Sequence, residues 1–197
     1  MLSEKFDDAL AFAARLHRQQ TRKGSAIPYV AHLLAVCSLV IEHGGNEDQA
    51  IAALLHDAAE DQGGEAILGE IRARYGPAVA EIVADCTDAW TEPKPAWRPR
   101  KEAYLAALPS KPRGSLLVSL ADKTHNAGAI LGDYRRMGEA LWDRFNGGRD
   151  GTIWYYRSLS AIFDEAMPGA LAEQLADTVR QFAEVPAGRE IGHRGSG

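Results

Sequence analysis

The sequence contains little cysteine, no long apolar run and no excess of basic residues. Its two cysteines, Cys37 and Cys86, each lie within an apolar helical pattern. This favours buried free thiols over a disulfide or a Cys-X-X-Cys metal site. Lysine and arginine number 22 against 27 aspartates and glutamates, which gives a net charge of −5. That balance argues against a general nucleic-acid binder, and an anionic small molecule would need a locally basic pocket.

Membrane and export signals are also missing from the sequence. No apolar run approaches the roughly 18 residues of a membrane span, and the N-terminus lacks the apolar segment of a signal peptide. We therefore expect a cytoplasmic protein with no membrane partner. The sequence leaves homo-oligomerisation open.

No segment alternates apolar and polar residues as a half-buried strand would. Apolar residues instead recur every three or four positions in successive segments, and 197 residues suit one domain of about 100–200. The sequence therefore predicts an all-α, single-domain helical bundle over residues 1–185. Residues 186–197 are rich in glycine and charge without apolar periodicity, and we expect a disordered tail there.

Capping residues predict where several helices begin. Ser3 and Ser115 are expected N-caps, and Pro28 is expected in the first turn of a helix. Further helices are predicted over 46–61 and 137–145. Residues 88–99 are predicted to form a loop because they include three prolines. The two tryptophans in this loop indicate that it packs against the domain.

A cluster of ionisable residues follows the apolar run 51–55. His56, Asp57, Glu60 and Asp61 lie within six positions on a predicted helix. Three carboxylates this close repel one another, and burying them without compensation would cost several kcal/mol. A bound cation would offset that cost, although a solvated polar helix end is the alternative.

Two further residues strengthen the metal interpretation. His32 lies on a mostly apolar segment, and Asp122 interrupts the apolar run 116–121, where a carboxylate is seldom tolerated without a partner. Taken singly, each has an ordinary structural explanation. Together with His56 and Asp57 they supply two imidazoles and two carboxylates, a suitable ligand set for a catalytic divalent metal.

These residues resemble the HD phosphohydrolase superfamily, in which a His…His-Asp…Asp set holds a metal. The flanking sequence narrows the resemblance to the hydrolase domain of RelA/SpoT proteins, and the match spans most of residues 5–165 in the right order. The matching segments are Arg22-Lys23, Pro28-Tyr29-Val30-Ala31-His32, residues 52–61 and Ala121-Asp122-Lys123-Thr124-His125-Asn126.

The resemblance implies hydrolysis of the 3′-pyrophosphate of guanosine tetra- or pentaphosphate, (p)ppGpp, the alarmone of the stringent response. The products would be GDP or GTP and pyrophosphate, and the cofactor would be one divalent metal ion, usually manganese. In this family the synthetase and regulatory domains follow the hydrolase domain, and 197 residues leave no room for them. We therefore expect a stand-alone small alarmone hydrolase, similar to the metazoan SpoT homologue.

The resemblance also implies roles for individual residues. The family's metal ligands match His32, His56, Asp57 and Asp122. The pair that orients or deprotonates the attacking water matches Glu60 and Asp61. The expected substrate-binding residues are Arg22, Lys23, Asn126, Tyr29 and Lys123. His125 matches a family histidine to which the sequence assigns no role.

Some positions depart from the family pattern. Ile27 replaces a small residue before Pro28, Gln62 replaces a threonine, and the segments 91–99 and 133–149 match poorly. The identity of the base is therefore open. One alternative is an HD hydrolase of another nucleotide, such as an adenosine alarmone or a 2′- or 3′-phosphorylated cofactor. A second is a non-catalytic alarmone-binding protein, which would have no need of Glu60 and Asp61.

Overall fold

The computed structural model describes residues 1–90 and 93–184, so the predicted tail at 186–197 lies outside the described residues. Within the described ranges the chain is helical, and strand pairing is limited to one isolated bridge between Thr21 and Pro28. This confirms the predicted all-α fold. The α-helices are α1 (Glu4–Leu16), α2 (Val30–Glu42), α3 (Glu47–Leu55), α4 (Ala58–Gln62), α5 (Gly64–Tyr75), α6 (Pro77–Cys86), α7 (Trp97–Ala107), α8 (Arg113–Met137), α9 (Gly148–Ala166) and α10 (Ala170–Ala183), and two 3₁₀ helices are η1 (Leu108–Ser110) and η2 (Gly138–Arg144).

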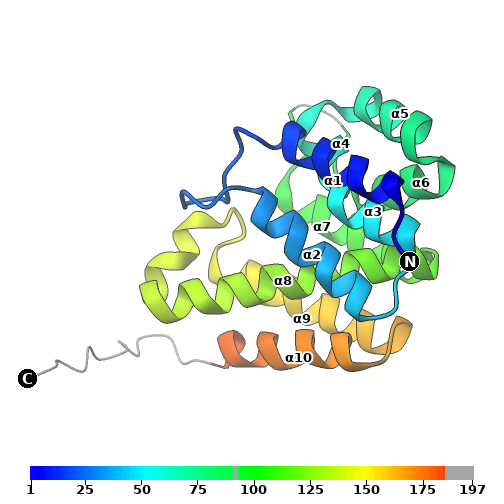
Figure 1. Ribbon diagram of the computed structural model, residues 1–197. Helices are drawn as coiled ribbons and strands as arrows, with labels where there is room; N and C mark the ends of the chain where they lie inside the picture. The colour runs from blue at the N-terminus through cyan, green and yellow to red at the C-terminus, as the bar shows by residue number, and fades with distance from the viewer. Residues whose placement is uncertain (91–92, 185–197) are drawn as a thin grey trace, which may run out of the picture.

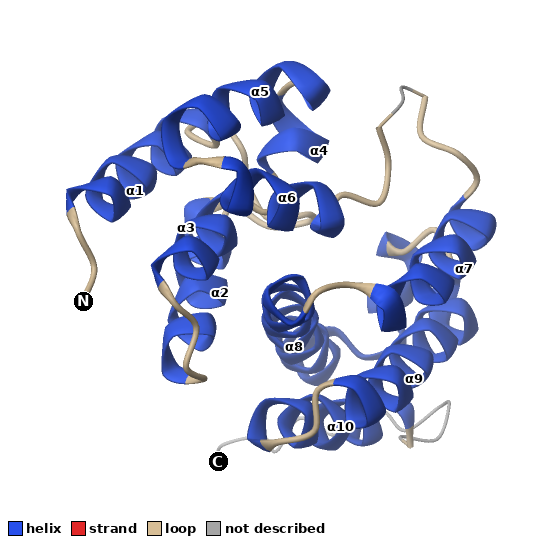
Figure 2. Ribbon diagram, turned by 90° about the vertical axis from the view of Figure 1, so that its right-hand side faces the viewer, coloured by secondary structure: helices blue, strands red, loops and turns tan. Residues whose placement is uncertain are grey.

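Helix α8 is the element around which the others pack (Figure 1). It contacts α2, α3 and α6 on one side and α9 and α10 on the other. Figure 2 shows α8 between a group formed by α1 to α6 and a group formed by α7, α9 and α10. Residues 115–122 are all buried, because neighbours cover every face of this part of the helix. Asp122 therefore lies in the interior.

Helix α3 is the second strongly buried element. Every residue from Ala50 to Leu55 has no exposed surface, and α1, α2 and α6 all pack against it. The alanines among these residues allow the neighbouring backbones to approach closely. Asn46 and Gln49 form a reciprocal capping box that fixes the start of the helix. No described helix is long and apolar enough to cross a membrane.

The predicted continuous helix over 46–61 is wrong, because α3 ends at Leu55 and α4 begins at Ala58. Asp57 has φ −96° and ψ −3°, which departs from regular helical geometry. Adjacent side chains on a regular helix point about 100° apart. The turn at His56 and Asp57 brings both side chains to one point, with His56 Nε2 only 2.9 Å from Asp57 Oδ2.

Three other predicted boundaries are wrong, whereas the Ser3 cap is confirmed. Ser115 lies inside α8, and its hydroxyl donates a hydrogen bond to Asp85 Oδ2 instead of capping the helix. The helix predicted over 137–145 is instead the end of α8 followed by η2, because Gly138 takes a positive φ of 61°. Pro28 precedes α2, since it pairs with Thr21 in the isolated bridge.

The predicted loop at 88–99 is shorter than expected, since α7 begins at Trp97. Pro99 is accommodated there because the first N–H groups of a helix have no intrahelical acceptor. Trp97 packs edge-on against Trp154 and Tyr155, as expected. The same expectation is wrong for Trp90, which is 43% exposed.

Two neighbouring leucines on α2 provide a matched test of this packing. Leu33 has no exposed surface, whereas Leu34 is 46% exposed. Leu33→Ala should lower the free energy of unfolding by about 2–5 kcal/mol because it leaves a cavity. Leu34→Ala should change it by about 0.5 kcal/mol or less. Urea denaturation measures both, and equal losses for the two variants would contradict this packing.

Candidate metal centre and nucleotide cavity

Four side chains from three parts of the chain meet in the interior, namely His32 on α2, His56 and Asp57 between α3 and α4, and Asp122 on α8. Asp57 Oδ2 lies 2.9 Å from His56 Nε2 and 3.5 Å from His32 Nε2. Asp122 Oδ1 lies 3.2 Å from His32 Nε2 and 3.6 Å from His56 Nε2. Donors bound to one ion at about 2.1 Å lie roughly 3.0–3.4 Å apart. His32, His56 and Asp57 therefore have the spacing of a metal site, and Asp122 lies beside both imidazoles.

The two imidazoles have their ring nitrogens arranged for metal binding. His56 Nδ1 lies 2.8 Å from the Ala53 carbonyl, which can only accept, so this nitrogen carries the proton. His32 Nδ1 lies 2.8 Å from His125 Nδ1. Both Nε2 atoms are buried and make no hydrogen bond within the described residues. Second partners of this kind orient the histidines of metal sites and fix their tautomers, so the donor set fits a metal ion.

Charge in this cluster has to be balanced. Burial raises the pKa of the Asp57 carboxyl, but the His56 imidazole 2.9 Å away and the neighbouring His32 imidazole hold that pKa well below its usual range. Burial lowers the pKa of His56, but Asp57 and Asp122 hold it well above its usual value. The two carboxylates thus require positive charge beside them, which a proton or a divalent cation can supply.

Further side chains orient the two carboxylates. The Tyr29 hydroxyl donates to Asp57 Oδ2 at 2.6 Å, and burial together with that carboxylate raises the pKa of Tyr29, which keeps it a donor. Lys123 Nζ donates to Asp122 Oδ2 at 2.6 Å, and Asn126 Nδ2 donates to Asp122 Oδ1. Such outer contacts hold ligands in place and tune their basicity.

Glu60 and Asp61 lie on α4, about one turn beyond Asp57. Lys94 Nζ donates to Glu60 Oε1 at 2.7 Å, and Gln20 Nε2 donates to Asp61 Oδ2 at 2.8 Å. Burial raises the pKa of both carboxyls, and neighbouring carboxylates add to the rise. A carboxylate with a raised pKa is a better proton acceptor.

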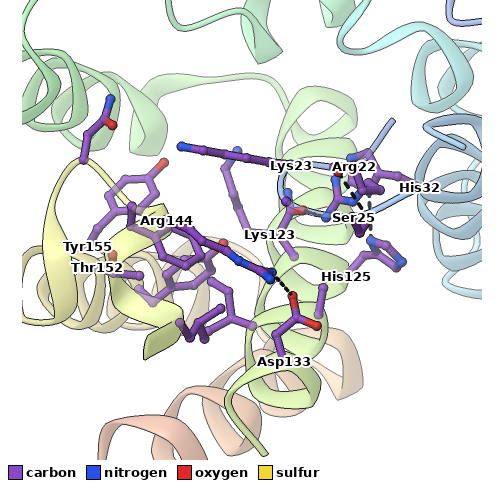
Figure 3. A pocket seen from close by; sticks show the side chains of 18 of the residues that line it. Arg22, Lys23, Ser25, His32, Lys123, His125, Asp133, Arg144, Thr152 and Tyr155 are labelled. Carbon is purple, nitrogen blue, oxygen red and sulfur yellow. Dashed lines mark hydrogen bonds and ion pairs between the residues drawn. The ribbon is translucent and has the colours of Figure 1, made fainter. Parts of the chain in front are cut away.

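A cavity of about 760 Å³ reaches the cluster at His32 (Figure 3). This volume suits a ligand the size of a nucleotide. Among the described residues that line it, Asp133 is the only carboxylate. The basic lining residues are Arg22, Lys23, Arg100, Lys101, Lys123, Arg136 and Arg144. The cavity is thus the locally basic pocket that an anionic ligand of this acidic protein requires.

All five predicted substrate residues line this cavity. Arg22 Nη2 donates to Asn126 Oδ1 at 2.6 Å, and the Arg22 guanidinium lies 5.7 Å from the centre of the Tyr29 ring. Arg22 and Lys23 lie on the loop before α2, whereas Lys123 and Asn126 lie on α8. Their contacts with a substrate stay a prediction.

Sequence reasoning missed several neighbours of the site. Gln20 and Lys94 each hold one of the paired carboxylates on α4, and Arg100, Lys101 and Arg144 line the cavity. Gln20 alone carried a usable signal, because it lies just ahead of the basic pair in the same polar loop. The other four lie in or after the proline-rich segment, where the sequence does not predict which way a side chain points.

The His125 side chain acquires a role from its position. Its Nδ1 meets His32 Nδ1, and its ring lies 4.9 Å from the His32 ring. Burial and the neighbouring His32 lower the pKa of His125 to about 4, so it is neutral near pH 7. A neutral His125 can accept the His32 Nδ1 proton, which leaves the His32 Nε2 lone pair free for a metal ion.

Comparison with known proteins agrees with this geometry. A family model described as an HD domain matches residues 9–153. Guanosine-3′,5′-bis(diphosphate) 3′-pyrophosphohydrolase MESH1 of Homo sapiens is 38% identical over 122 residues, which cover 60% of this chain and 65% of that protein, just under two thirds of its length. The protein of the same name from Xenopus tropicalis is 37% identical over 138 residues, covering 68% of this chain and 72% of that protein.

A solved structure extends the likeness to the fold. It belongs to a metazoan orthologue of SpoT that hydrolyses ppGpp, and it matches with a TM-score of 0.76 at 27% identity. The match covers 92% of this chain and 97% of the other. The family model spans well over half of the sequence, including all four residues of the histidine–aspartate cluster. The chain belongs to the HD domain family.

Proposed function

We propose that this protein is a metal-dependent hydrolase that removes the 3′-pyrophosphate of (p)ppGpp and releases GDP or GTP and pyrophosphate. One observation carries the proposal. The histidine–aspartate cluster opens at His32 into a cavity whose described lining has seven basic residues and one carboxylate. A nucleotide with phosphates on both sides of its ribose is an anion that such a cavity suits. The human and Xenopus relatives are guanosine-3′,5′-bis(diphosphate) 3′-pyrophosphohydrolases, which supports the proposal.

We propose that His32, His56, Asp57 and Asp122 hold one divalent ion and that this ion is Mn²⁺. Support comes from the donor distances of 2.9–3.6 Å and from the two buried Nε2 atoms that lack hydrogen bonds within the described part. Imidazole paired with carboxylate suits a first-row transition metal, and carboxylates favour Mn²⁺ among them. When bound, a divalent cation supplies Lewis-acid activation of water and phosphate.

Glu60 and Asp61 are proposed to orient the attacking water and to accept its proton. Their place one turn beyond Asp57 puts them near the cluster without making them part of the ligand set. Their raised pKa values support the proton-accepting role. Lys94 Nζ donates to Glu60 Oε1 and the Asp88 N–H donates to Glu60 Oε2 at 3.4 Å, while Gln20 holds one oxygen of Asp61.

Arg22 and Lys23 are proposed to meet the base and phosphates, since a guanidinium plane can both stack and form paired hydrogen bonds. Asn126 keeps Arg22 in place from α8. The Tyr29 ring is proposed to face the sugar while its hydroxyl stays on Asp57. Lys123 is proposed to neutralise the departing pyrophosphate, in keeping with its position between Asp122 and the cavity.

We further propose that residues 1–185 act as one hydrolase domain in the cytoplasm, with a small nucleotide and no nucleic acid as partner. The net charge of −5 supports the exclusion of nucleic acid. The seven basic side chains that line one cavity support a small ligand.

Incubation with Mn²⁺ tests the substrate directly. The purified protein should convert ppGpp to GDP and pyrophosphate in equal amounts, as measured by anion-exchange chromatography. The adenosine analogue ppApp serves as the matched comparison. Cleavage of ppApp or of a phosphorylated cofactor with ppGpp left intact would contradict the proposed substrate. Absence of any cleavage would contradict the proposed enzymatic activity.

Glu60→Gln tests the proton-accepting role. The amide keeps the size of the side chain and an oxygen for Lys94, but it cannot take a proton. Turnover should fall by about 10²–10⁴-fold, the usual contribution of a general base, while Mn²⁺ content measured by mass spectrometry stays at the wild-type level. Wild-type turnover in this variant would remove Glu60 from the mechanism.

A further inference from the structure

The loop that carries Arg22 and Lys23 is closed at its base by backbone hydrogen bonds. The Tyr29 N–H donates to the Gln20 carbonyl at 2.9 Å, and the Arg22 N–H donates to the Ile27 carbonyl at 2.9 Å. Gln20 and Tyr29 therefore lie side by side at the entry and exit of this loop.

Both residues also reach the histidine–aspartate cluster and its neighbours. The Tyr29 hydroxyl donates to Asp57 at 2.6 Å, and Gln20 Nε2 donates to Asp61 at 2.8 Å. Among the described residues, Gln20 is the only one that donates a hydrogen bond to the Asp61 side chain. Lys94 Nζ is 4.0 Å from the other carboxylate oxygen.

The Gln20 amide is itself held in one orientation. Its Oε1 accepts a hydrogen bond from Gln62 Nε2 at 2.7 Å and lies 2.6 Å from His17 Nδ1. His17 is 2% exposed, and its ring stacks on Tyr29 with centroids 5.3 Å apart. Turning the amide over would place its NH₂ group against the Gln62 NH₂ donor, so Nε2 has to face Asp61.

We propose that Gln20 is a positioning residue that aims the Asp61 carboxylate and couples that aim to the loop carrying Arg22 and Lys23. The proposal rests on the catalytic role proposed for Asp61. A donor is needed because Asp61 is 25% exposed and lies near the negative charge of Asp57, which would turn a free carboxylate toward solvent. Gln62, which departs from the family pattern, donates to Gln20 Oε1 and so helps to hold the Gln20 amide in this orientation.

Two substitutions separate the donor from the rest of the contact. Gln20→Met keeps the length of the side chain but removes every hydrogen bond that the Gln20 side chain makes. Gln20→Glu keeps the oxygen facing His17 and Gln62, but replaces the donor to Asp61 with a like charge. Both should lower kcat by about 10- to 100-fold, part of the usual contribution of a general base, and should change KM by less than about threefold. Mn²⁺ content should stay at the wild-type level.

A double-mutant cycle shows whether Gln20 acts through Asp61. If it does, Gln20→Met combined with Asp61→Asn should lose no more kcat than Asp61→Asn alone. Gln49→Met is the control, because it removes an equivalent amide from the capping box of α3, at the end of that helix away from His56 and α4. It should lower Tm without lowering kcat.

Thermal unfolding of the wild type, the two single variants at Gln20 and Asp61, and the double variant gives a readout that does not depend on turnover. The Tm changes of Gln20→Met and Asp61→Asn should be non-additive, since one hydrogen bond joins the two side chains. The kinetic cycle is run on whichever nucleotide the wild type cleaves. If ppGpp is not cleaved, the proposed substrate is wrong, but the cycle still tests the role of Gln20. Additive kcat losses, additive Tm changes, or wild-type kcat in Gln20→Glu would each overturn the proposal.

Discussion

Two buried imidazole nitrogens facing two carboxylates are the interaction on which the rest of the site depends. The Nε2 atoms of His32 and His56 make no hydrogen bond within the described ranges, yet each lies within 3.6 Å of Asp57 and Asp122 oxygens. Burying such a cluster is costly unless a cation is shared among its members. The four side chains stay together because the packing of α2, α3 and α8 fixes the positions from which they extend.

The structure around the histidine–aspartate cluster is arranged to bring these four side chains together. The continuous helix breaks at His56 and Asp57 so that two adjacent side chains can face one point. A run of eight buried residues on α8 carries Asp122 inward. Lys123, Asn126 and Tyr29 then orient the carboxylates and also line the cavity. The histidine–aspartate cluster and the basic cavity therefore share residues, and the loop before α2 contributes Arg22 and Lys23 to the cavity.

Much of this could be predicted from the sequence, for identifiable reasons. Helical periodicity predicts the all-α fold, because helices such as α1 and α10 bury one stripe of apolar residues. His32, His56, Asp57 and Asp122 stand out because charged groups on apolar segments need partners. The break after Leu55 could not be predicted, since it results from the side chains meeting in three dimensions and not from a glycine or proline. Ser115 is not the cap that the sequence predicts, because its hydroxyl has a tertiary partner, Asp85. Lys94 was missed because its contact with Glu60 spans 34 residues.

The most direct measurement of the central claim is anomalous diffraction from crystals soaked in Mn²⁺, recorded on either side of the manganese edge. The account predicts one strong peak about 2.1–2.3 Å from the Nε2 atoms of both His32 and His56, with oxygens of Asp57 and Asp122 completing the ligand set. A map without a peak there, with the two imidazoles hydrogen-bonded to the carboxylates at full Mn²⁺ concentration, would contradict it.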